Sequence, residues 1–113
     1  MLPAKFRLTS EKDFKRINRS GRALFSAYFR VKYLANNLAV SRFAVVVSTK
    51  VSKKATKRNL LRRQISEIIR LNKVKIRPGC DIIISVSPKA LGQDYHSLEK
   101  AILDLLGKAR LLK

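Results

Sequence analysis

The sequence predicts an α+β fold in which three helices pack against a small mixed β-sheet. Two observations lead to this prediction. Apolar residues fall into periodic segments in the order helix, two strands, helix, strand, helix. The chain has 113 residues, 46% of them hydrophobic, which suits one modest core and is too apolar for a disordered basic tail. No internal repeat or long linker interrupts the chain, so residues 1–113 are expected to form a single domain.

The first helix is expected to begin at Ser10 and to end near Ser20. Ser10 and Asp13 have a spacing like that of a capping box, in which side chains satisfy the free backbone N–H groups of the first turn. Gly21 follows the helix and is expected to supply a left-handed C-cap.

A long strand is expected next, over residues 23–35. Its alternation separates an apolar face from a face that mixes aromatic and basic groups. After the turn at Asn36 and Asn37, residues 42–50 are apolar on both faces and predict a central strand. On the long strand, Phe29, Val31 and Tyr33 point one way, and Tyr28, Arg30, Lys32 and Leu34 point the other way.

The second helix is expected over residues 57–71, with Thr56 as its N-cap and Asn72 as its C-terminal stop. A projection at about 100° per residue gives a polar arc and an apolar arc, with Ile69 at the border. The polar arc holds Arg58, Asn59, Arg62, Arg63, Ser66 and Arg70, and the apolar arc holds Leu60, Leu61, Ile65, Ile68 and Leu71.

A buried strand over residues 80–87 follows, and Pro88 ends it. The last helix is expected over residues 94–109, with Leu98, Ala101, Ile102, Leu105 and Leu106 on its inner face. The strand, helix and strand between residues 42 and 87 fit a parallel crossover unit.

The charge of the chain points to a polyanionic partner. It has 26 Lys and Arg against 7 Asp and Glu, a formal net charge of +19, and so many like charges repel one another in the compact state. No apolar run approaches the roughly 18 residues of a membrane span, and the N-terminus lacks the apolar region of a secretory signal. We therefore expect a cytoplasmic protein that binds nucleic acid and no membrane.

The sequence does not suggest a catalytic or metal site within the polypeptide. Cys80 is the only cysteine and His96 the only histidine, so one chain cannot form a disulfide or a Cys/His metal site. Metal-dependent hydrolysis of phosphodiesters needs converging carboxylates, whereas the seven acidic residues are scattered. Glu11 and Asp13, two apart on a helix, face different ways. No catalytic residue and no cofactor of the polypeptide are predicted.

The polar arc of the second helix is the first candidate RNA-binding surface. Arginine holds phosphate bidentately and stacks on bases, and a helix N-terminus attracts anions. A solvated charged face is the ordinary alternative, but only Glu67 offsets the arginines of this helix. We therefore favour RNA contact, to which a preceding lysine cluster would add: Lys50, Lys53, Lys54 and Lys57.

A second candidate surface combines Phe14 on the first helix with Tyr28, Arg30 and Lys32 on the mixed strand face. Aromatic rings beside basic groups form a stacking platform for single-stranded nucleic acid. Phe14 and Tyr28 are also ordinary core residues by type, and for Phe14 the two interpretations are equally weighted.

One segment resembles the signature of the bacterial ribonuclease P protein family. It consists of residues 48–59, Ser-Thr-Lys-Val-Ser-Lys-Lys-Ala-Thr-Lys-Arg-Asn, followed by Arg62 and Arg63 on a helix. The resemblance covers nearly the whole chain. It includes Phe6-Arg-Leu before a capped helix, Asp13-Phe14 within it, Gly21 after it, Pro78-Gly-Cys-Asp-Ile before the third strand and Tyr95 at the start of the last helix. The sequence departs from the family pattern at Leu60, usually Arg, at Ser66, often basic, and at Asn18, often aromatic.

The resemblance implies a ribonuclease P protein domain whose crossover is left-handed. It implies that a catalytic RNA subunit, with Mg²⁺ in the RNA holoenzyme, removes the 5′ leader of precursor tRNA, while the polypeptide alone is inactive. Arg58, Asn59, Arg62 and Arg63 would then meet the RNA subunit or metal-bound phosphates near the cleavage site. Phe14 would line a cleft for the leader, with Arg30 and Lys32 beside it. No obligate protein partner is expected.

Two other classes of protein share part of this pattern. A ribosomal or other structural RNA-binding protein would have the same charge, size and basic helix, but would not need an aromatic and basic cleft for a single strand. A cationic membrane-surface protein would leave the apolar arcs of its helices exposed, whereas here they are needed to cover the strands.

Overall fold

The computed structural model describes residues 2–113. Its four strands form one sheet in the order β1-β2-β4-β3. The pairs β1–β2 and β2–β4 are antiparallel, and β3–β4 is parallel. The strands are β1 (Arg22–Phe25), β2 (Phe29–Ala35), β3 (Arg42–Val46) and β4 (Cys80–Val86).

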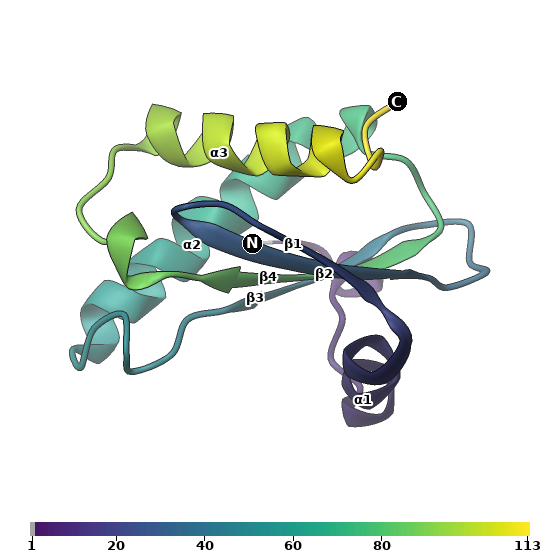
Figure 1. Ribbon diagram of the computed structural model, residues 1–113, viewed down its shortest axis with the longest axis horizontal. Helices are drawn as coiled ribbons and strands as arrows, with labels where there is room; N and C mark the ends of the chain where they lie inside the picture. Colours follow the sequence, from purple (N-terminus) through teal and green to yellow (C-terminus); the bar gives the residue numbers. More distant parts are fainter. Residues whose placement is uncertain (1) are drawn as a thin grey trace.

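Three helices cover the two faces of this sheet, as Figure 1 shows. Helices α2 (Ala55–Asn72) and α3 (Tyr95–Lys108) lie on one face, and α1 (Glu11–Ser20) lies on the other. Helix α2 connects the parallel strands β3 and β4, so the α+β class and the crossover unit are confirmed. The left-handed sense of the crossover stays a prediction. Within residues 2–113, no helix combines the length and the apolar character needed to cross a bilayer.

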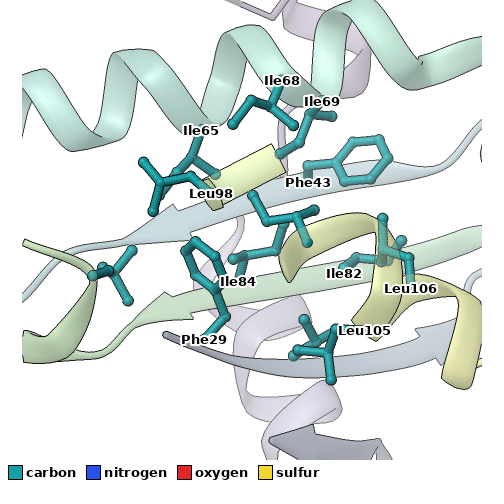
Figure 2. Close-up of a cluster of buried hydrophobic side chains, with 14 of the residues drawn as sticks. Phe29, Phe43, Ile65, Ile68, Ile69, Ile82, Ile84, Leu98, Leu105 and Leu106 are labelled. Atoms are coloured by element: carbon teal, nitrogen blue, oxygen red, sulfur yellow. The ribbon is translucent and has the colours of Figure 1, made fainter. Parts of the chain in front are cut away.

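The main core lies between the sheet and the pair α2 and α3 (Figure 2). Side chains such as Ile65 and Ile68 of α2 meet Ile82 and Ile84 of β4, and all four are fully buried. Helix α3 adds Leu98, Ile102, Leu105 and Leu106, which confirms its predicted inner face; Ala101 is half-buried at the edge of this cluster.

A smaller core holds α1 against the opposite face of the sheet. Its buried members are Leu8, Ile17 and Ile83. Phe14 packs against them and remains half-buried. Because so few apolar groups hold α1, its position depends strongly on the polar contacts described below.

The prediction of one long strand over residues 23–35 is wrong, because the chain forms there the hairpin of β1 and β2. Ser26 makes the turn: its N–H donates to the Phe29 carbonyl at 2.8 Å, and its Oγ accepts from the Phe29 N–H at 3.2 Å. Tyr28 therefore lies in the turn and packs on the main core, not on the face of Arg30 and Lys32 as predicted.

The strand predicted as central is instead the edge strand β3, because β4 inserts between it and β2. Both faces of the strand are covered at Phe43 and Ala44, whereas Val46 at its end is exposed. Phe43 packs into the main core and Ala44 lies beneath α1. The N–H of Leu8 donates to the Phe43 carbonyl at 2.8 Å, so the N-terminal segment covers part of the exposed edge.

Three predicted caps are not formed as expected. Ser10 precedes α1, but its side chain makes no capping hydrogen bond. Gly21 has a φ of −76°, so it is not left-handed. Its role is close packing, since a Cβ there would lie 2.5 Å from the Ile17 carbonyl oxygen and 3.0 Å from that of Tyr33. Helix α2 begins at Ala55 after Lys54, not after Thr56, and no side chain caps it.

Candidate nucleic-acid interface

The arginine row of α2, which consists of Arg58, Arg62, Arg63 and Arg70, lies on the solvent side of the helix. Asn59, Arg62 and Arg63 are exposed, and Arg58 is half-buried with its Nη1 donating to the Ser52 carbonyl at 2.9 Å. Nη1 of Arg62 donates to Asn59 Oδ1 at 2.7 Å, which orients the guanidinium. Within residues 2–113, none of these arginines forms an ion pair with a carboxylate. Their charge is therefore available to a ligand.

Arg70, at the far end of the same face, is bound to a carboxylate. Its Nε donates to Glu67 Oε2 at 2.9 Å, and Nη2 donates to Oε1 of the same side chain. The hydrogen bonds between the two side chains raise the pKa of the Arg70 guanidinium and lower the pKa of the Glu67 carboxylate. This half of α2 thus offers less free positive charge than the half around Arg62.

The buried side of α2 differs in three residues from the projection. Leu60 and Leu71 are more than half exposed, and Ile69 is fully buried. The stripe that packs on the sheet and α3 is Leu61, Ile65, Ile68, Ile69 and Asn72, with the spacing i, i+4, i+7, i+8, i+11. Leu60 and Leu71 lie about 100° or more from the centre of this stripe.

The lysine cluster lies where α2 begins. Lys50, Lys53, Lys54 and Lys57 are all exposed, and the first turn of α2 contains no acidic side chain. Ser48 Oγ accepts from the backbone N–H of Lys50, and Ser52 Oγ accepts from that of Lys54. Free N–H groups, the positive end of the helix dipole and the ammonium groups together make this end of α2 suitable for phosphate.

A groove of about 240 Å³ joins α1 to α2 across the edge of the sheet. Phe14 of α1, Val46 of β3, and Arg62 and Ser66 of α2 are among its lining residues. An adjoining hollow of about 240 Å³ is lined by Asn59, Arg62, Arg63 and Ser66. Phe14 of one predicted surface therefore meets Arg62 of the other, whereas Arg30 and Lys32 do not line this groove.

The open face of the sheet holds the remaining predicted residues. Arg30 and Lys32 point to the α1 side, where Lys32 Nζ donates to Asn18 Oδ1 at 3.2 Å. Sequence reasoning missed Phe25, whose exposed ring stands opposite Arg30 in the hairpin, with Arg30 Cζ 5.1 Å from the ring centroid. The missing signal was the turn at Ser26, without which Phe25 cannot be assigned to a face.

A buried carboxylate, also missed by sequence reasoning, ties α1 to the sheet. Asp81 of β4 is completely buried and accepts from Nε and Nη2 of Arg42 at 2.8 and 2.7 Å. It also accepts from Arg16 Nη2 at 2.7 Å and from Asn36 Nδ2 at 2.9 Å. The Asp81 hydrogen bonds raise the pKa of Arg42, whose Nη2 also lies 3.2 Å from Asp13 Oδ2 of α1. The sequence signal that could have revealed this buried carboxylate is an acidic residue at the start of an apolar strand.

Acidic side chains are unevenly distributed along the chain. No Asp or Glu occurs between Asp13 and Glu67, a stretch that contains the hairpin, β3, the lysine cluster and the arginine row as far as Arg63. Among residues 2–113, no three His, Cys, Asp or Glu side chains come together in an arrangement that could hold a metal ion. Burial raises the pKa of the Cys80 thiol, which disfavours its reactive thiolate form.

A family model described as Ribonuclease P matches residues 2–110. The chain belongs to the ribonuclease P protein family. The ribonuclease P protein component of Synechocystis sp. is 35% identical over 98% of this chain and 90% of that protein. The component from Thermotoga maritima is 37% identical over 88% of each. A solved structure of the ribonuclease P protein from T. maritima superposes with a TM-score of 0.84, at 35% identity, over 90% of this chain and 96% of that one.

Ribonuclease P family membership gives the chain a subunit role in tRNA processing, as part of an endoribonuclease complex. The alternative of a ribosomal or other structural RNA-binding protein is not favoured, because the relatives across the length of the chain are ribonuclease P components.

Proposed function

We propose that this protein docks on the catalytic RNA subunit of ribonuclease P and holds the 5′ leader of precursor tRNA, so that the RNA subunit removes the leader. The observation that carries the proposal is the groove lined by both Phe14 of α1 and Arg62 of α2. One wall of this groove suits a single-stranded leader, and the other suits RNA phosphates. A strand in it would therefore lie directly beside the docking surface.

The docking surface consists of the lysine cluster and the front half of the arginine row. Three exposed or half-exposed guanidiniums, at Arg58, Arg62 and Arg63, have no carboxylate partner among residues 2–113 and can each hold phosphate through two N–H groups. Asn59 adds an amide beside them. Because no acidic side chain lies in the first turn of α2, approaching phosphates meet no repulsion there.

The leader surface consists of Phe14, Lys32 and Arg30. A base can stack on an exposed aromatic face whatever its identity, and basic groups beside it neutralise the phosphates, so the site selects a single strand and not a sequence. Mature tRNA lacks the leader and cannot occupy this surface. Leader binding therefore favours the substrate over the product.

Cleavage is assigned to the RNA subunit, and the Mg²⁺ of the holoenzyme to RNA phosphates. The side chains of residues 2–113 do not fit a metal site, and the one fully buried carboxylate, Asp81, is already bound by Arg16 and Arg42. The partners are the RNA subunit and precursor tRNA, the site of action is the cytoplasm, and no protein partner is required.

The test is to add the purified protein to its cognate ribonuclease P RNA at low Mg²⁺ and to measure the cleavage of precursors with leaders of different lengths. We expect the protein to increase cleavage, and to do so more for long leaders than for short ones. Equal stimulation for all leader lengths would contradict the leader site, and no stimulation at all would contradict the assignment as a whole.

A further inference from the structure

Phe25 is the most exposed aromatic side chain on the sheet, and nothing in the core explains it. It exposes 67% of its surface, whereas its neighbour Leu24 packs against the main core. The guanidinium of Arg30 lies over its ring, with Cζ 5.1 Å from the ring centroid. A ring with a cation over it and most of its surface open is a preformed place for another planar group to stack.

Phe25 and Arg30 belong to a row of side chains that crosses the open face of the sheet. Phe25 pairs with Arg30, Arg30 with Ser85, and Ser85 with Val46, so one residue comes from each strand. All four project to the α1 side, beyond the part of the sheet that α1 covers. Val46 also lines the groove shared by Phe14 and Arg62. The row therefore leads from that groove to Phe25.

The far end of the row has room for a base. A shallow pocket of about 310 Å³ is lined by Phe25, Arg30, Ser85, Ser87 and other residues of the hairpin and the end of β4. This volume is at the lower end of the roughly 300–1,000 Å³ range of small-molecule sites. Aromatic, guanidinium and hydroxyl groups in one pocket match the face and the edges of a nucleobase.

The surrounding charge selects an anionic occupant. The hairpin and β3 lie within the stretch between Asp13 and Glu67 that has no acidic residue. Lys32, paired with Ile83 on the same face of the sheet, flanks the row. A second copy of this chain is a poor occupant, because each copy carries a net charge of +19 and the two would repel. A single strand of RNA supplies both the negative charge and the planar rings.

We infer that Phe25 and Arg30 form a second stacking site for the 5′ leader, which holds a base distant from the cleavage site. The inference rests on the proposed function and adds to it a specific position along the leader. Three strand spacings of about 4.8 Å separate Val46 from Phe25, a distance of about 14 Å. A leader with its bases stacked at about 3.4 Å covers that distance in about four nucleotides. Only leaders that extend at least that far past the groove reach Phe25.

The experiment compares the wild type with Phe25→Ala, each assembled with the cognate RNA subunit, on precursors whose leaders are shorter or longer than this limit. Leaders carry a fluorescent purine analogue, whose emission falls on stacking, at one position at a time. We expect Phe25→Ala to lower the ratio of long-leader to short-leader affinity by about 5- to 30-fold. The quenching at one distant leader position should disappear in the variant.

Matched variants separate stacking from general apolar contact. Phe25→Trp should retain the long-leader affinity and Phe25→Leu should lose it, while Arg30→Lys, which keeps the charge but not the plane, should lose part of it. Leu38→Ala removes a comparably exposed apolar group in the loop after β2 and should bind as the wild type does.

Three outcomes overturn the inference. If the wild type depends on leader length and Phe25→Ala shows the same dependence and the same quenching, the second stacking site is wrong and the proposed function stands. If Phe25→Leu behaves as the wild type does, the contact is not stacking. If the wild type itself shows no dependence on leader length, both the proposed function and this inference fail.

Discussion

At the scale of single residues, the arginines of this chain divide into those used for folding and those free to bind. Arg42 and Arg16 neutralise the buried Asp81, and Arg70 is paired with Glu67. Arg62 and Arg63 have no carboxylate partner within residues 2–113. The net charge of +19 therefore overstates the number of groups available to RNA. Substitutions should separate the two classes.

Arg62→Ala should weaken assembly with the RNA subunit while leaving the fold unchanged. A charge-assisted hydrogen bond contributes about 1.5–3 kcal/mol, so the dissociation constant should rise about 10-fold or more. An exposed side chain of this kind changes the free energy of unfolding by less than about 0.5 kcal/mol. Filter binding of the RNA subunit and thermal unfolding measure the two quantities. Lys100→Ala, exposed on α3, is the control and should leave both unchanged.

Phe14→Ala should chiefly weaken discrimination between leader-bearing and mature tRNA. Because Phe14 also packs on Leu8 and Ile17, the substitution should cost about 2 kcal/mol of stability. Phe14→Leu retains most of that packing but not the aromatic face, so it should still lose discrimination. The measurement is the ratio of holoenzyme affinities for precursor and mature tRNA. If Phe14→Ala and Arg62→Ala lower affinity equally for every RNA, the two-surface model fails.

At the scale of elements, local pattern predicted the helices well and the sheet less well. The predicted bounds of α1 and α3 lie within one residue of those observed, because the apolar period marks both locally and the Asp94 cap marks the start of α3. The hairpin was missed because Ser26-Ala27-Tyr28 lacks the Gly, Pro, Asn or Asp that usually marks a turn. The edge position of β3 depends on where β4, some forty residues later, inserts, and no local pattern carries that information.

The candidate site was likewise predicted where it depends on local pattern and missed where it depends on the tertiary fold. The arginine row of α2 was predictable, because helical period alone places its members on one side. Phe25 and the groove between Phe14 and Arg62 were not, since they depend on the hairpin register and on how α1 meets the sheet. Asp81 could be noticed in the sequence, but its partners come from three separate segments.

Asp81→Asn should loosen α1 and reduce leader binding more than docking on the RNA subunit. It leaves Arg42 and Arg16 without their buried carboxylate, which costs about 3 kcal/mol after allowing for the partial exposure of both arginines. Helix α2 is anchored on the opposite face of the sheet and should keep its position. The checks are denaturant unfolding and affinity for precursor and RNA subunit separately.

Asp13→Asn, which removes a partly exposed partner of Arg42, is the matched control for that substitution and should cost less stability. Wild-type stability in Asp81→Asn would show that the ion cluster does not hold α1. An equal loss of leader binding and RNA docking would show that its effect is not confined to one face of the sheet.

The start of α3 should make part of the stability dependent on acid. Asp94 Oδ1 accepts from the Ser97 N–H at 2.8 Å, and this bond lowers the pKa of Asp94. A group with a lowered folded-state pKa stabilises the fold above its unfolded pKa, near 3.8, and loses that contribution as pH falls through the lower folded value. Asn can still cap the helix but does not titrate. The free energy of unfolding of Asp94→Asn should therefore fall less steeply than that of the wild type as the pH is lowered over that range. Parallel curves for the two proteins would contradict this role.

At the scale of the whole molecule, charge is unevenly distributed over the fold. The hairpin, β3, the lysine cluster and most of α2 carry only basic charges, whereas α3 carries Glu99 and Asp104 on the opposite side of the sheet from α1. Positive charge that no carboxylate of residues 2–113 neutralises is therefore concentrated where the groove and the arginine row meet, since Asp13 and Asp81 are paired with Arg16 and Arg42. Such asymmetry orients an approaching polyanion before any contact forms.

Salt should separate the charged contacts from the stacking contacts. If the protein neutralises about 6 to 10 phosphates of its RNA, the logarithm of its affinity for that RNA should fall linearly with the logarithm of the salt concentration. Each neutralised phosphate adds about 0.7 to 0.9 to the slope. Arg62→Ala should lower the steepness by about one unit or less, because one phosphate contact is lost. Phe14→Leu and Phe25→Ala should lower the affinity for precursor tRNA at every salt concentration. They should keep the wild-type slope of log affinity against log salt, because an aromatic ring releases no counterions. If the aromatic variants change the slope as Arg62→Ala does, the rings act only by placing nearby cations, and the leader is held by charge alone.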